Sequence, residues 1–289
     1  MITAVSLSEI NTILKKSPDG PRGFVPTMGA LHAGHMSLIG EAIKECPLIV
    51  VSIFVNPTQF NDATDLINYP RTPGKDLDML GRALRENDIV FMPGVNDIYP
   101  EEDKRVFDFG ELDKVMEGLH RPGHFNGVAQ VVTRLFDIVN PDVAFFGQKD
   151  FQQLTIIKSL VRQTGRSVKI KGCPIIREKD GLAMSSRNAL LEPSIREKAG
   201  VIFRTLRDAS EMTAVKSIAE LKEFAVKSIN ETEGFSIDYF EIVDDTELKP
   251  VISSDDIRKN SRYYGCIAVR AGNIRLIDNY EFSFPVQKG

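Results

Sequence analysis

The chain has 289 residues, 42% of them hydrophobic and 26% charged, and such a chain can bury a sizeable core as one large domain or two smaller ones. Its formal net charge of −4 leaves no overall basic excess, so nucleic acid is not an expected partner. The three cysteines, Cys46, Cys173 and Cys266, are odd in number and outside any CxxC, which argues against a disulfide framework or a zinc site.

The opening residues lack a charged leader followed by an apolar core, and no later stretch approaches the ~20 apolar residues that a membrane span needs. Together with the cysteine pattern, this predicts a protein of the reducing cytosol with no membrane partner.

From Arg22 to about Ile176, short apolar runs alternate with helical patterns. The predicted strands cover residues 23–27, 48–55, 88–92, 143–146 and 168–173. The predicted helical faces are formed by Leu31, His35, Leu38, Ile39, Ala42 and Ile43, and by Val128, Val131, Val132, Leu135, Phe136 and Val139. Strands and helices in alternation predict an α/β fold with a parallel, doubly wound, Rossmann-like sheet.

After about Asp180 the pattern changes to that of a smaller α+β unit. Its predicted elements are a helical stripe through Ile195, Ala199, Ile202, Phe203 and Leu206, a second through Ile218, Leu221 and Phe224, and strands at 237–243, 263–269 and 273–277. Charged, Gly, Ser and Pro residues cluster between Ile176 and Ser194, so we predict domains of residues 1–176 and 177–289. The long polar connection from Asn56 to Gly74 is a candidate lid.

The segment PTMGALHAGHMSLI, residues 26–39, follows the first predicted strand and opens a helix, where open α/β sheets bind nucleotides. Gly29 and Gly34 would let a ligand approach the backbone, and His32 and His35, three residues apart, can face the same side of the helix start. With the helix N-terminal N–H groups, two imidazoles form a donor cluster for polyphosphate. One histidine alone would more often be a cap, but two that bracket a glycine favour a ligand role.

This HxGH resembles the HIGH motif of adenylate-forming nucleotidyltransferases. No GxxxxGK[ST] occurs, and no GxGxxG follows a strand, so kinase-type and dinucleotide-binding functions lose support.

The segment REKDGLAMSSRN, residues 177–188, offers the hydroxyls of Ser185 and Ser186 and the guanidinium of Arg187 to phosphate oxygens. It resembles the mobile KMSKS-type loop that partners the HIGH motif. SSR alone would more often be a solvated turn that caps a helix, but its pairing with HxGH favours a phosphate clamp.

The segment FFGQKDFQQL, residues 145–154, stands at the carboxyl end of a predicted strand. Lys149 can meet a phosphate, Asp150 a ribose hydroxyl and Gln153 a polar substrate group. For Lys149 and Asp150 a surface ion pair is an equally good reading without the other motifs.

In VNPTQF, residues 55–60, the amides of Asn56 and Gln59 suit a hydroxy acid, although an Asn-Pro turn would account for Asn56 alone. YPRT at 69–72 and RPGHFNGV at 121–128 each add an arginine and a fixed turn. For Arg121 or His124, a ligand role and a structural role are evenly balanced.

In this order and spacing, PTMGALHAGH, FVNPTQF with YPRT, RPGHFNGV with GQKDFQQL, and DGLAMSSRN resemble the pantothenate synthetase family over nearly all of residues 22–190. The resemblance implies an ATP site formed by Met28, Gly29, Ala30, Leu31, His32, Ala33, Gly34, His35, Gly147, Gln148, Lys149, Asp150, Ile176, Met184, Ser185, Ser186 and Arg187. It makes His35 the key catalytic histidine, lets Gln59 and Gln153 hold pantoate, and gives Ile176 a backbone contact to adenine. It also implies a homodimer.

The implied reaction activates the carboxylate of pantoate with ATP as an adenylate, and the amine of β-alanine then displaces AMP. No protein nucleophile is required, which fits the lack of a GxSxG signature. The residues expected to neutralise phosphate charge are His32, His35, Lys149, Ser185, Ser186 and Arg187. We expect Mg²⁺ to be bound mainly by the phosphates, with Asp76 as a candidate protein ligand. Because an adenylate hydrolyses readily, the 56–74 connection would exclude water.

Three alternatives remain. An HxGH transferase that moves AMP or CMP onto a phosphate ester would favour more cations in place of Gln59 and Gln153. An aminoacyl-tRNA synthetase would need an anticodon reader, for which about 100 residues after residue 188 leave little room. A nucleotide sensor that lacks turnover is disfavoured because His35, Lys149 and Arg187 are intact.

Overall fold

The computed structural model describes residues 1–17, 20–61 and 63–285, and the chain forms two compact units. Met1–Gln148 and Ile156–Pro174 make up the first, and Lys149–Thr155 and Ile175–Gly289 the second. The short segment Lys149–Thr155 therefore groups with the C-terminal part of the chain. The domain boundary between residues 176 and 177 stays a prediction.

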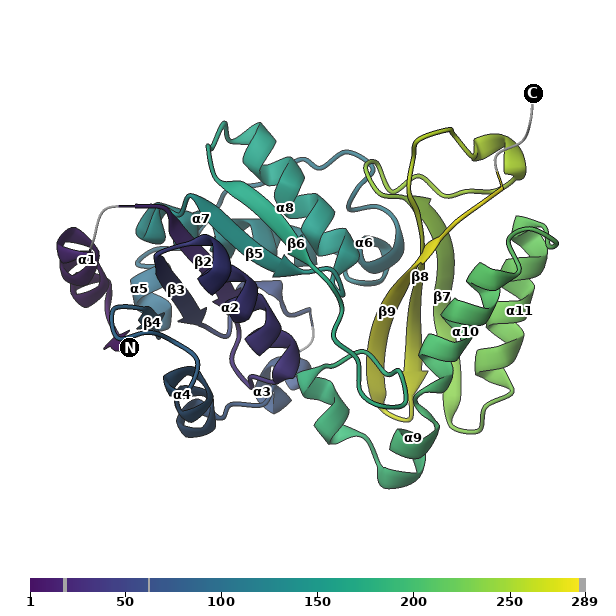
Figure 1. Cartoon of the computed structure of the whole chain (residues 1–289), viewed down its shortest axis with the longest axis horizontal. Helices are drawn as coiled ribbons and strands as arrows, with labels where there is room; N and C mark the ends of the chain where they lie inside the picture. The colour runs from purple at the N-terminus through teal and green to yellow at the C-terminus, as the bar shows by residue number, and fades with distance from the viewer. Residues whose placement is uncertain (18–19, 62, 286–289) are drawn as a thin grey trace. The chain divides into compact units, whose positions relative to one another are not determined.

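The first unit contains a six-stranded sheet with the order β1-β4-β3-β2-β5-β6, and its neighbouring strands are parallel. The strands are β1 (Ile2–Ala4), β2 (Arg22–Thr27), β3 (Leu48–Ile53), β4 (Ile89–Phe91), β5 (Val143–Gly147) and β6 (Lys169–Cys173). The predicted doubly wound sheet is confirmed (Figure 1). Edge strand β1 was not predicted, because three residues are too few to show a period.

The helices that accompany this sheet are α1 (Leu7–Lys16), α2 (Ala33–Glu45), η1 (Pro57–Gln59), α3 (Ala63–Asn68), α4 (Pro73–Gly81), α5 (Val95–Ile98), α6 (Met116–His120), α7 (His124–Val139) and α8 (Phe151–Gln163). The candidate lid, residues 56–74, thus contains η1, α3 and the start of α4, and residue 62 within it lies outside the described residues. Its function as a lid stays a prediction.

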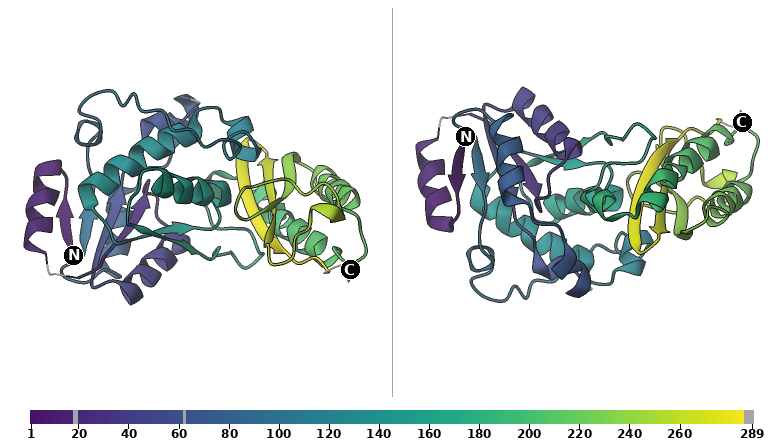
Figure 2. Two further views of the ribbon diagram at one scale, coloured as in Figure 1. Left: turned by 90° about the horizontal axis from the view of Figure 1, so that it is seen from above. Right: turned by 90° about the horizontal axis from the view of Figure 1, so that it is seen from below.

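Apolar side chains cover both faces of the sheet. Val25 of β2 and Val51 of β3 belong to one buried cluster with Leu38 of α2, whereas the ring of Phe24 lies 6.2 Å from that of Phe136 in α7. Successive side chains of a strand point to opposite faces, so α2 and α7 lie on opposite faces of β2. Figure 2 gives two further views of these layers. Burial on both faces explains why these strands are continuous apolar runs.

β2 and β5 are neighbours in the sheet, but the chain leaves them in opposite directions. After β2 it proceeds to β3, on one side, and after β5 it proceeds to β6, on the other. Such a reversal of strand order places a crevice at the carboxyl ends of the two strands. Met28 follows β2 and Gln148 follows β5, so the segments 26–39 and 145–154 both pass through this edge of the sheet.

In the second unit, β7 (Phe235–Asp244), β8 (Tyr263–Ala271) and β9 (Ile274–Phe282) form an antiparallel sheet. The other elements are η2 (Ser186–Leu190), α9 (Pro193–Lys198), α10 (Val201–Glu211), α11 (Ile218–Asn230) and η3 (Ser254–Asp256). Leu206 of α10 and Leu221 of α11 share a buried cluster with Ile267 of β8, and the two helices lie along one face of the sheet in Figure 1.

The single helical stripe predicted from Ile195 to Leu206 is wrong, because α9 ends at Lys198 and α10 begins at Val201. Gly200 lies between them, and a Cβ there would stand 2.7 Å from the carbonyl oxygen of Asp180. This close backbone approach is invisible to a periodicity argument. None of the helices within residues 1–17, 20–61 and 63–285 is long and apolar enough to cross a membrane.

Gly127 of α7 lies directly against η1, and a Cβ at this position would stand 2.4 Å from the carbonyl oxygen of Thr58. Gly127→Ala should therefore lower the free energy of unfolding by about 1–3 kcal/mol, because backbone must move to relieve the overlap. Gly40→Ala in α2 is the matched control, since its Cβ would meet open space, and it should be neutral or stabilise by about 0.5–1 kcal/mol. Urea unfolding of both variants checks this, and equal effects would contradict the packing argument.

Candidate active site

The turn between β2 and α2 has an unusual backbone. Gly29 has φ +80° and Ala30, which carries a side chain, has φ +49°, a conformation that costs a non-glycine residue about 1 kcal/mol or more. The backbone N–H groups of Ala30 and Leu31 donate to the two carboxylate oxygens of Asp76 at 2.9 and 2.8 Å. These bonds from α4 hold the strained turn in place.

Asp76 is 1% exposed, and its carboxylate also accepts a hydrogen bond of 3.0 Å from the Thr72 hydroxyl. A magnesium ion on this carboxylate would compete with all three donors. Within the described residues, no group of three or more His, Cys, Asp or Glu side chains could hold a metal ion. Sequence reasoning missed the support that Asp76 gives to the turn, and its role as a metal ligand stays a prediction.

His32 and His35 cap the start of α2. The backbone N–H of Gly34 donates to Nδ1 of His32 at 3.1 Å, and that of His32 donates to Nδ1 of His35 at 3.3 Å. The ring centroids are 4.1 Å apart. Because Nδ1 accepts in both rings, the proton of each neutral imidazole lies on Nε2. Capping through Nδ1 is therefore compatible with the predicted donor role of Nε2. The capping hydrogen bonds also fix the direction in which each Nε2–H points.

The amide groups that follow β3 lie in a buried network. Asn56 is 1% exposed, and its Nδ2 donates to Oε1 of Gln59 at 3.3 Å and to the carbonyl of Gly127 at 3.1 Å. Its Oδ1 accepts from the hydroxyl of Tyr99 at 2.9 Å and also caps η1. Both polar ends of Asn56 thus serve the fold, while Gln59 Nε2 points to the sulfur of Met28 at 3.0 Å.

His124, at the start of α7, contacts the backbone of Gln59. Its Nδ1 lies 2.8 Å from the carbonyl oxygen of Gln59, and its Nε2 lies 3.3 Å from the Arg121 guanidinium. A carbonyl can only accept and a guanidinium can only donate, so the proton is on Nδ1, opposite to His32 and His35. For His124 the structure thus supplies a supporting role that the sequence left open.

The segment 145–154 is divided between the two units. Gly147 ends β5 in the first unit, and the N–H of Gln148, the next residue, donates to the carbonyl of Cys173 at 2.8 Å. Lys149 follows in a turn and is half-buried, and Asp150 is exposed. Gln153 is half-buried in the first turn of α8.

The segment 177–188 lies wholly in the second unit and begins with a small hairpin. Arg177 and Ala183 pair as an antiparallel bridge, and the N–H of Met184 donates to the carbonyl of Ile176 at 2.9 Å. The hydroxyl oxygen of Ser185 accepts from the N–H of Arg187 at 3.3 Å and caps η2. Ser185, Ser186 and Arg187 are half-buried. The turn that the sequence offered as the plain alternative is thus present, and the clamp function stays a prediction.

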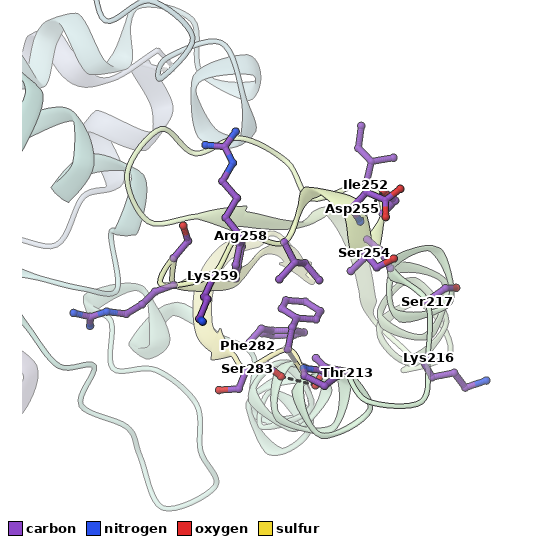
Figure 3. Close-up of a pocket in the computed structure, with 18 of the residues that line it drawn as sticks. Thr213, Lys216, Ser217, Ile252, Ser254, Asp255, Arg258, Lys259, Phe282 and Ser283 are labelled. Atoms are coloured by element: carbon purple, nitrogen blue, oxygen red, sulfur yellow. Dashed lines mark hydrogen bonds between the residues drawn. The ribbon is translucent and has the colours of Figure 1, made fainter. Parts of the chain in front are cut away.

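A separate cavity of about 800 Å³ lies in the second unit (Figure 3). Its lining includes Thr213, Lys259 and Phe282, and the hydroxyl of Thr213 donates to the carbonyl of Ser283 at 2.7 Å. Among the residues that the structure describes, no predicted site residue lines this cavity.

A doubly wound parallel sheet with an HxGH helix start at its switch point defines an α/β protein of the doubly wound class, in which ligands bind at the carboxyl ends of the strands. Within that class, the chain belongs to the pantoate–β-alanine ligase family, whose model matches residues 3–281.

Curated relatives named pantothenate synthetase include that of Porphyromonas gingivalis, 49% identical over 90% of this chain and 91% of the relative. The pantothenate synthetase of Phocaeicola vulgatus is 50% identical over the same shares. The crystal structure of pantothenate synthetase from Thermus thermophilus has a TM-score of 0.89 at 40% identity, with 99% of this chain and all of that chain covered. The ligase from Francisella tularensis, described as complexed with beta-gamma ATP and β-alanine, has a TM-score of 0.79 at 35% identity, with 97% of each chain covered.

Asp76→Asn should destabilise the turn at Ala30 and Leu31, because an amide offers one acceptor oxygen where the carboxylate offers two. The loss of a hydrogen bond to a charged group should lower the free energy of unfolding by about 1.5–3 kcal/mol. Amide hydrogen exchange at Ala30 and Leu31 should accelerate. Asp78→Asn, at an exposed position of the same helix, is the control and should change neither quantity. Unchanged exchange in Asp76→Asn would show that the turn holds without this carboxylate.

Proposed function

We propose that this chain condenses pantoate with β-alanine to give pantothenate, with ATP converted to AMP and pyrophosphate. The observation that carries the proposal is the HxGH start of α2 at the carboxyl end of β2, in a member of the pantoate–β-alanine ligase family. Membership of the family supports the choice of substrates. The two histidines at the start of α2 support the chemistry of the first step.

A carboxylate does not acylate an amine at neutral pH, so one carboxylate oxygen of pantoate first attacks the α-phosphorus of ATP. The bond from that phosphorus to the oxygen that bridges the α- and β-phosphates breaks, and pyrophosphate leaves. The β-alanine amine then attacks the acyl carbon of the pantoyl adenylate, AMP leaves with the bonding electron pair, and the amine proton passes to solvent or phosphate. Alignment and charge stabilisation suffice for both steps.

The Nε2–H groups of His32 and His35 are the proposed donors to the oxygens of the α-phosphate. Their Nδ1 atoms accept from the backbone, so the donors are oriented before ATP binds, which is the condition under which hydrogen bonds stabilise developing charge most. The residues proposed to bind the remaining phosphate charge and the nucleoside are Gly147, Gln148, Lys149, Asp150, Ile176, Met184, Ser185, Ser186 and Arg187.

Gln59 is proposed to bind pantoate, together with Gln153. Its Nε2 contacts the thioether of Met28, which is a weak acceptor, so a substrate oxygen can replace the sulfur at little cost. Asn56 is proposed to act through Gln59, because its own amide is bonded to Gln59 and to the backbone of Gly127.

The proposal includes Mg²⁺ that enters with ATP, a homodimer and a cytosolic location. Mg²⁺ keeps phosphate and water ligands readily, whereas the Asp76 carboxylate is bonded to Ala30, Leu31 and Thr72. The three cysteines are buried free thiols, in keeping with a reducing compartment. The dimer is supported by resemblance to the family.

The deciding experiment measures AMP, pyrophosphate and pantothenate from purified protein with ATP, Mg²⁺, pantoate and β-alanine, each omitted in turn. AMP and pantothenate should form in equal amounts only when all are present. Without β-alanine, at most one pyrophosphate per site should appear, because the adenylate remains bound. AMP formation that does not depend on pantoate would contradict the proposal.

His35→Ala should lower the rate of AMP formation by about 10²–10³-fold, the usual effect of losing one donor to developing charge. His120→Ala, at an exposed histidine in α6, is the control and should keep the wild-type rate. A His35→Ala protein that folds and turns over normally would remove His35 from the mechanism.

The Mg²⁺ dependence separates the two roles of Asp76. If the ion enters with ATP, Asp76→Asn should leave the Mg²⁺ concentration at half-maximal rate unchanged, measured at saturating ATP, even where the maximal rate falls. A tenfold or larger increase in that concentration would instead assign Asp76 as a metal ligand.

A further inference from the structure

Strand β9 carries two neighbouring polar residues that are buried, Asp278 at 3% and Asn279 at 2% exposure. Successive side chains of a strand point to opposite faces of the sheet. Leu276, two residues before Asp278, belongs to the cluster with α10 and α11, so Asp278 faces the helices and Asn279 faces away. Buried polar groups need hydrogen-bond partners, and the partners of these two lie in different motifs of the proposed nucleotide site.

Asp278 holds Arg177 on the helix side. The Arg177 guanidinium donates to both carboxylate oxygens, at 2.6 and 3.1 Å, and to the carbonyls of Gly181 and Asn279, each at 3.1 Å. Its central carbon lies 4.1 Å from the ring centroid of Phe203 in α10. A planar guanidinium with this many fixed partners has one orientation, so Arg177 is anchored to β9.

Arg177 opens the hairpin that leads into the serine segment. It pairs with Ala183, and the N–H of Glu178 donates to the carbonyl of Leu182 at 2.8 Å. Met184 follows directly, with its N–H on the carbonyl of Ile176. The hairpin therefore fixes where the chain enters the segment that starts at Ser185. The hairpin itself is held to β9 by Arg177.

Asn279 holds the lysine turn on the other face. Its Nδ2 donates to the carbonyl oxygen of Lys149 at 3.0 Å. Two residues further, the ring of Phe151 lies 4.5 Å from that of Tyr264 in β8. Tyr264 pairs with Glu281, which lies on the same face of β9 as Asn279. The Lys149 turn is thus held on the sheet by the hydrogen bond from the Asn279 side chain and by the contact between the rings of Phe151 and Tyr264.

We propose that Asp278 and Asn279 are positioning residues through which one strand fixes both Lys149 and the segment Met184–Arg187 before ATP binds. The inference rests on the proposed function, which assigns these two segments to the phosphates and nucleoside. The second unit would then contribute to catalysis through β9, which keeps Lys149 and the segment Met184–Arg187 at a fixed separation. ATP would bind to segments that are already ordered.

A double-mutant cycle on the rate of AMP formation tests this. Asn279→Ala should lower kcat about tenfold in the wild-type background, because a displaced lysine stabilises the transition state poorly. In the Lys149→Ala background, which keeps the carbonyl that Asn279 binds, the same change should lower kcat less than twofold. Asp278→Asn should behave in the same way towards Arg187→Ala. Rates are taken where each protein is fully folded by circular dichroism.

Glu281→Gln is the matched control, an exposed change on the Asn279 face of the same strand. The new amide keeps an acceptor oxygen for the Tyr264 hydroxyl, which lies 3.3 Å from the carboxylate, so this variant should keep the wild-type kcat.

A tenfold loss from Asn279→Ala in both backgrounds would mean a general effect on the fold and would overturn the inference, as would no loss in either. If Asp278→Asn does not fold, the Asn279 cycle decides alone. A wild-type protein that forms no AMP would defeat the proposed function itself, a result distinct from any outcome of the cycle.

Discussion

The first unit depends on the hydrogen bonds from the Ala30 and Leu31 backbone to the buried Asp76 carboxylate. Without these hydrogen bonds, nothing described in this turn would offset the free-energy cost of the left-handed backbone at Ala30. With them, the chain leaves β2, turns and enters α2 at a fixed angle, and the two histidines become the first capping groups of that helix. A buried charge is tolerated because backbone donors satisfy it.

The second unit repeats this arrangement with different partners. Asp278 is also buried, and burial raises the pKa of its carboxyl while Arg177 and the Asn279 N–H act against that shift. In both units a carboxylate from one element holds a turn of another, and both turns lead into a motif of the proposed nucleotide site. Rigid support of this kind holds charge-binding groups in place before the ligand binds. Binding then does not have to order a loop, which would cost free energy.

His32, His35 and His124 show how one residue type serves different functions in the first unit. His32 and His35 accept backbone N–H groups through Nδ1 and carry the proton on Nε2, whereas His124 donates through Nδ1 to the Gln59 carbonyl. The hydrogen bond at one nitrogen fixes what the other can do. The first pair can therefore donate to a phosphate, while His124 supports the residue proposed to bind the acid.

Local sequence patterns were enough to predict the parallel sheet and the HxGH start after β2, because apolar runs and helical periods report which faces are buried. Motif order and spacing along residues 22–190 were enough to predict the family. The same patterns did not reveal strand β1, the break at Gly200, or the tasks of Asp76, Asp278 and Asn279. Each of these three side chains bonds to groups far away in the chain, and a buried carboxylate shows its purpose only when the folded chain has brought its donors to it.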